Sequence, residues 1–97
     1  MPKRTGKRVL SLTLMREYFD AIVDGTKKTE FREYKPYWRV RLEERDYDEV
    51  HFRNGYSAKA PFMRVQFRGA RKRKTSRGME FAIALGKVLE LKHYKRH

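Results

Sequence analysis

Apolar positions in the first third of the chain follow the spacing of a helix. Five of them recur three or four residues apart and place one apolar face on that helix: Met15, Tyr18, Phe19, Ile22 and Val23. Gly25 predicts the helix end, because glycine adopts the left-handed conformation without a Cβ penalty. Pro36 can open a second, shorter helix that continues to Glu44 and places Trp38 and Leu42 on one face.

Alternating apolar and polar positions predict the strands, which are expected over 9–13, 29–34, 48–54, 62–68 and 81–91. In the third of these, Val50 and Phe52 face opposite to Glu49, His51 and Arg53, and Asn54-Gly55 marks a turn. Gly86 predicts a bulge or a barrel corner in the last strand. The segment 69–78 is almost wholly polar and basic, so a loop that stays disordered without a ligand is expected there.

These elements predict an α+β fold, a small and partly closed β-barrel of five to six strands with two short helices. The 97 residues are expected to form one domain over 9–97, preceded by a flexible basic arm over 1–8. The absence of cysteine fits a reducing cytoplasm, and no apolar run is long enough to cross a membrane. We expect a cytoplasmic monomer without a metal or cofactor.

The segment between the first helix and the next strand carries the strongest chemical signal. Lys27 follows the helix end, and Glu30 and Arg32 share one strand face because Phe31 points to the other. A carboxylate and a guanidinium placed in this way can pair and present hydrogen-bonding groups to a base or a phosphate. The alternative interpretation is an ordinary ion pair across a turn.

The spacing Gly-x-Lys-x-x-Glu-x-Arg, formed by Gly25, Lys27, Glu30 and Arg32, resembles the signature of ASCH domains. This resemblance implies a PUA-like β-barrel in which Lys27, Glu30 and Arg32 line a central cleft. Some ASCH proteins hydrolyse the acetyl amide of N4-acetylcytidine with a lysine, a threonine and a glutamate, and others are described as ribonucleases. Lys27 matches the lysine. The threonine position holds Glu30, and the adjacent Thr29 faces the other side of the strand, which disfavours the amidohydrolase reaction.

Aromatic and polar residues beside this segment extend the candidate site. Tyr34 and Tyr37 are candidates for base stacking, whereas Trp38 is more typical of a core position. By the same resemblance, Arg53-Asn54-Gly55-Tyr56 borders the cleft, with Arg53 for a phosphate, Asn54 for a base edge and Tyr56 beside them, although Asn54-Gly55 is first a turn signal.

The net charge of +13 favours a polyanionic partner, and its distribution is uneven. Acidic residues cluster over 43–49, whereas 50–79 contains nine basic residues and no acidic one. We therefore predict binding of RNA or another single-stranded nucleic acid, with four further basic residues on the backbone: Arg71, Lys72, Arg73 and Lys74. A protein partner is an alternative. If the chain is an enzyme, metal-independent RNA cleavage by Lys27, Glu30 and Arg32 is favoured.

Overall fold

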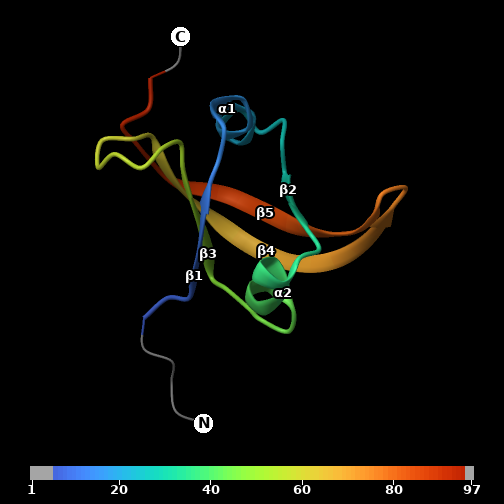
Figure 1. Ribbon diagram of the computed structural model, residues 1–97. Coiled ribbons are helices and arrows are strands. Elements are labelled where there is room, and N and C mark those ends of the chain that lie inside the picture. Colours follow the sequence, from blue (N-terminus) through green and yellow to red (C-terminus); the bar gives the residue numbers. More distant parts are fainter. Residues whose placement is uncertain (1–5, 96–97) are drawn as a thin grey trace.

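A single five-stranded sheet with two short helices forms the framework of the protein in the computed structural model, which describes residues 6–95 (Figure 1). The elements in chain order are β1 (Val9–Thr13), α1 (Arg16–Asp24), β2 (Thr29–Glu33), α2 (Pro36–Leu42), β3 (Glu49–Arg53), β4 (Phe62–Thr75) and β5 (Gly78–Lys92). This arrangement confirms the predicted α+β class, with five strands and two helices.

The strand order β1-β3-β4-β5-β2 places the first two strands of the chain at opposite edges of the sheet. The β1–β3 pair is parallel, and the other three pairs are antiparallel. The sheet curves into a half-barrel, so that β1 and β2 pass on the same side of the long β4–β5 hairpin, while α1 and α2 lie at the two ends of β2 (Figure 1). The open side of the half-barrel therefore lies between β1 and β2.

The core fills the inner face of this half-barrel. It consists of apolar side chains from all the elements except β2: Leu10, Leu12, Leu14, Phe19, Ile22, Leu42, Val50, Phe52, Met63, Val65, Phe81, Ile83 and Leu85. Helix α1 contributes Phe19 and Ile22, but Met15 and Tyr18 are 65% and 45% exposed. The predicted apolar face of this helix is thus only partly buried. Gly25 ends the helix with φ 82°, as expected.

The expected loop over 69–78 is wrong, because this segment forms most of the distal half of the β4–β5 hairpin. The two strands pair without interruption from Ala70↔Ile83 to Thr75↔Gly78, and only Ser76 and Arg77 lie between them. The backbone of this segment is held by hydrogen bonds to β5, so its basic side chains need not pack into a core. These side chains alternate between the two faces of the sheet. We call residues 70–83 the basic ribbon.

The bulge expected at Gly86 is confirmed, since the register of β4 against β5 shifts between Val65 and Phe67. The amide of Lys87 donates a hydrogen bond to Gln66 Oε1 at 3.1 Å. A Cβ atom at Gly86 would lie 2.5 Å from that oxygen, so a larger residue would displace the Gln66 side chain that holds the bulge.

The start of the described chain is attached to β3. The Arg8 amide donates to the Asp48 carboxylate at 2.9 Å, and Lys7 Nζ lies 2.8 Å from Glu49 Oε2. The rest of the predicted basic arm, residues 1–5, lies outside the described residues. Between residues 6 and 95, no helix is long and apolar enough to cross a membrane.

Candidate functional site

The carboxylate of Glu30 is the centre of the predicted site. Glu30 pairs in register with Ile83, so its side chain faces the interior from an edge strand, and the residue is only 6% exposed. Lys27 Nζ lies 3.2 Å from Oε1, and Arg32 Nη2 donates to Oε2 at 2.6 Å. The structure therefore brings Lys27, Glu30 and Arg32 together, with one cation on each oxygen of the carboxylate. This arrangement offsets the cost of burying the charge.

Arg32 connects the two edges of the sheet. The same Nη2 that binds Glu30 also donates to the carbonyl of Thr13 on β1 at 3.3 Å. The guanidinium carbon lies 5.0 Å from the centre of the Trp38 ring, within the range of a cation–π contact. Trp38 itself is half-buried against the core, which agrees with its predicted position. Arg32 thus spans the open side of the half-barrel, backed by an aromatic ring.

The Nε atom of Arg32 is buried and has no hydrogen-bond partner among the described residues. A buried donor without an acceptor costs about 1–3 kcal/mol, so such groups are rare in folded proteins. An acceptor oxygen from a bound molecule would satisfy it.

The two cations that contact Glu30 line different surface hollows. Lys27 lines one of about 680 Å³, together with the end of α1 and with Gly86 and Lys87 of β5. Arg32 lines the other, of about 600 Å³, together with the β2–α2 connection and the tip of the basic ribbon. The carboxylate is buried between these two cations, so Glu30 orients the groups that reach the surface.

The predicted aromatic residues have different environments. Tyr34 is half-buried, packs on Phe81 with ring centres 5.3 Å apart, and donates from its hydroxyl to Glu43 at 3.2 Å. Tyr37 is 56% exposed on α2, and the Arg41 guanidinium lies 3.5 Å from its ring centre. Tyr34 therefore has a structural role. The Tyr37 ring is exposed to solvent, and Arg41 already covers one of its faces.

The Arg53-Asn54-Gly55-Tyr56 segment meets the end of β1. The Asn54 side-chain amide donates to the Leu14 carbonyl at 2.9 Å, so this Asn fixes the β1–α1 connection beside the Thr13 carbonyl that Arg32 contacts. Arg53 is exposed, and its guanidinium lies 4.9 Å from the Phe62 ring centre. Tyr56 is 92% exposed in the 54–61 connection. Of these residues, Asn54 has the clearest structural role.

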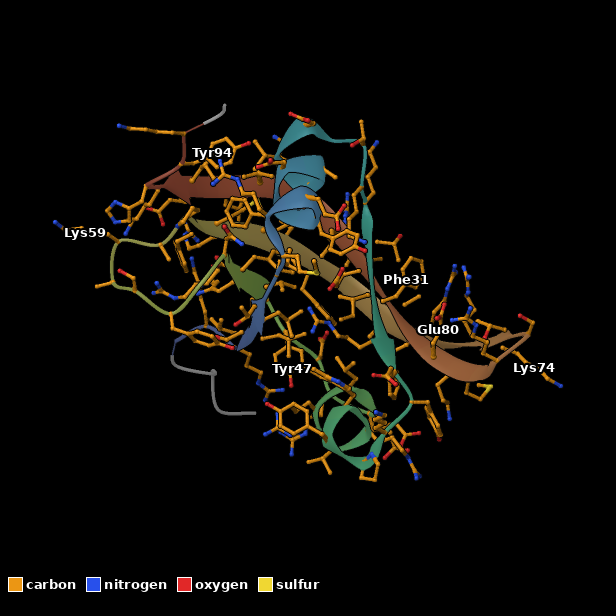
Figure 2. All side chains as sticks on the ribbon, turned by 45° about the horizontal axis from the view of Figure 1, so that its top comes forward. Phe31, Tyr47, Lys59, Lys74, Glu80 and Tyr94 are labelled. Carbon is orange, nitrogen blue, oxygen red and sulfur yellow. The ribbon has the colours of Figure 1, made fainter. Side chains whose placement is uncertain are left out.

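Two of the four predicted basic-ribbon cations are paired with acids. Lys72 Nζ lies 3.3 Å from Glu43 Oε2, and Arg73 Nε lies 3.1 Å from Glu80 Oε2. Arg39 lowers the pKa of Glu43 from its usual value, with further hydrogen bonds from Lys72 and Tyr34. Arg71 and Lys74 are exposed, and Lys74 points away from the body at the tip of the hairpin (Figure 2).

A second buried carboxylate, Glu49, was not predicted. It is 4% exposed, and three basic groups contact it: Lys7 at 2.8 Å, Arg64 at 2.7 Å and His51 at 3.0 Å. The alternation of side chains along the strand correctly predicts that Glu49 and His51 point to the same face of the sheet and Val50 to the other. Its burial depends on long side chains from the start of the chain and from β4, and no local pattern contains that information.

Comparison with models of known protein families, with curated proteins and with solved structures gives no match for this chain. Within residues 6–95, no three His, Asp or Glu side chains form a group that could hold a metal ion.

The Glu49 cluster predicts a pH dependence of stability. Hydrogen bonds from Lys7, Arg64 and His51 lower the pKa of Glu49 from 4.5 to about 2, so the folded state binds its proton more weakly than the unfolded state. The stabilisation is complete above about pH 4.5 and is lost as the pH falls towards about 2. Urea unfolding of the wild type and of Glu49→Gln should therefore show a difference in unfolding free energy that shrinks over this interval. A constant difference would contradict the assignment.

Proposed function

We propose that the protein is a nucleic-acid-binding module with a PUA-like, ASCH-type fold, in which Lys27 and Arg32 contact a base or phosphate and the basic ribbon holds the backbone. The observation that carries this proposal is the buried Glu30 carboxylate, which fixes two cations at the opening between β1 and β2. A fixed guanidinium provides planar, directional donors, which suit phosphate oxygens and the edges of bases.

The unsatisfied Nε of Arg32 supports a ligand at this position. Its Nη2 already donates to Glu30 and Thr13, whereas Nε has no acceptor among the described residues and can donate to a ligand oxygen. The partner that fits is an anion or a carbonyl, and both occur in nucleotides.

The basic ribbon supports a polyanion over a small anionic metabolite. Its cations are held on paired strands, so less conformational entropy is lost on binding than for a disordered loop. The net charge of +13 adds long-range attraction towards a phosphate backbone. The ribbon is also attached to α2, because Lys72 pairs with Glu43 at the end of that helix.

Salt dependence tests the contribution of the ribbon. If about five cations contact phosphates of a single strand, the logarithm of the binding constant should fall with the logarithm of salt concentration with a slope of about −3.5. The variant with Arg71, Lys72, Arg73 and Lys74 changed to Ala should flatten this slope to about −0.7, since about one contact remains. Fluorescence anisotropy with a labelled single-stranded RNA measures both slopes.

A matched control separates local contacts from total charge. Changing Arg45, Lys59, Lys92 and Lys95 to Ala removes the same formal charge from exposed positions outside the ribbon, and Lys59 lies on the side of the molecule opposite Lys74 (Figure 2). This variant should keep most of the wild-type slope. Equal slopes for the two variants, or a wild-type slope near zero, would refute the proposed role of the ribbon.

Metal-independent RNA cleavage is the second candidate function, and the observation favouring it is the approach of Lys27 and Arg32 to one carboxylate. In this reaction the RNA displaces one of the two cations that cover Glu30, and the 2′-oxygen attacks the phosphorus to form a cyclic phosphate as Glu30 takes its proton. Lys27 gives a proton to the departing 5′-oxygen, and Arg32 stabilises the charge on the phosphorane.

Cleavage of a labelled single-stranded RNA in the presence of a chelator tests this candidate. The wild type should cleave, and Lys27→Ala and Glu30→Gln should each reduce the rate by about 10²-fold or more, as expected for loss of general acid–base catalysis. Cleavage that survives both substitutions would assign the activity to another site or to a contaminant. If the wild type binds RNA without cleaving it, the site is a binding site only.

A further inference from the structure

The outer face of the sheet, opposite Glu30, carries an exposed aromatic residue among cations. Phe31 on β2 pairs with Ala82 on β5, and Ala82 pairs in turn with Arg71 on β4. These three residues therefore lie in one row across three strands. Phe31 is 40% exposed, and its side chain lies beside β2 where that strand meets β5 (Figure 2).

Two cations approach the Phe31 ring. The Arg73 guanidinium carbon lies 5.0 Å from the ring centre and Lys27 Nζ lies 5.5 Å from it, both within the range of cation–π contacts. Arg73 belongs to β4, two strands away, and reaches Phe31 across β5. Ala82 makes this possible, because a larger side chain in the middle of the row would keep the two groups apart.

Two hollows adjoin this row. One, of about 350 Å³, is lined by Thr29, Arg68, Gly69, Ala70, Arg71, Ala82 and Ala84. The other is the 600 Å³ hollow at the ribbon tip, to which Phe31 and Arg77 both contribute. Arg68, Arg71 and Arg77 form no ion pair with an acid within residues 6–95, unlike Arg73 with Glu80. The ring thus lies between two concave surfaces. The smaller is lined by Arg68 and Arg71 without an acidic residue, and the larger also contains Glu33 and Glu80, which pair with Lys35 and Arg73.

We propose that this outer face is a second binding surface, for single-stranded nucleic acid, with one base stacked on Phe31 beside Arg73 and phosphates on Arg71 and Arg77. Exposed aromatic rings on a sheet, flanked by basic groups, hold unpaired bases in this way, because every base offers a π-face. A duplex has no unstacked base to offer. The charge complements a phosphate backbone, and the inference rests on the proposed nucleic-acid binding. The surface shares Lys27 with the Lys27–Glu30–Arg32 site, but its stacking ring and its phosphate contacts come from Phe31, Arg71 and Arg77.

Substitution of Phe31 tests the stacking contact. Phe31→Leu keeps an apolar side chain but removes the ring, and should weaken binding of a short labelled oligouridine about 5- to 100-fold. Phe31→Tyr keeps the ring and should bind within about twofold of the wild type. Thermal melting of each variant verifies folding, which Phe31 should affect little because it lies outside the core.

Two further comparisons make the test specific. An abasic strand of equal charge should bind the wild type and Phe31→Leu equally, since it has no base to stack. Arg32→Lys alters the inner site but removes no contact to the Phe31 ring. The ratio of wild-type to Phe31→Leu affinity should therefore be the same in the Arg32→Lys background as in the wild-type background. Equal affinity of Phe31→Leu and wild type for oligouridine would overturn the proposal, as would an equal loss on the abasic strand or no binding of RNA by the wild type.

Discussion

The buried ion cluster around Glu30 is the constraint on which the candidate site depends. The sheet order leaves β1 and β2 as edges that approach one another without strand pairing. An apolar residue at the Glu30 position would simply extend the core. The chain instead buries a carboxylate there, and the charge must be compensated by Lys27 and Arg32. Arg32, which compensates the buried charge, also donates a hydrogen bond to the Thr13 carbonyl. The same guanidinium therefore links β2 to β1 across the open side.

The same cluster determines what the surface presents. Glu30 holds its two cations in fixed positions, and each lines a different hollow. The Gly25 turn places Lys27 by ending α1 in the left-handed conformation, and strand alternation places Arg32. The alternation that turns Arg32 inward turns Phe31 outward. One short segment therefore serves both the proposed inner site and the proposed outer surface.

Local patterns predicted the parts of this structure that depend on local geometry. The end of α1 at Gly25, the shared face of Glu30 and Arg32 and the bulge at Gly86 follow from backbone preferences within a few residues. The basic ribbon was not predicted, because its run of cations contains almost no apolar residue and its hydrogen bonds come from a distant partner, β5. The Glu49 cluster was missed for a similar reason, since Lys7 and Arg64 reach it from 42 and 15 positions away in the chain.

The most direct test of the central claim is the nuclear magnetic resonance signal of the Arg32 Nε–H group during titration with a short single-stranded RNA. If Arg32 supplies a ligand-binding donor, this signal should shift and its exchange with water should slow as the site fills, with saturation at the same concentration as the binding measured by anisotropy. A signal that stays unchanged while the RNA binds, with shifts confined to the basic ribbon or the Phe31 face, would contradict the claim that the Glu30 cluster prepares Arg32 for a ligand.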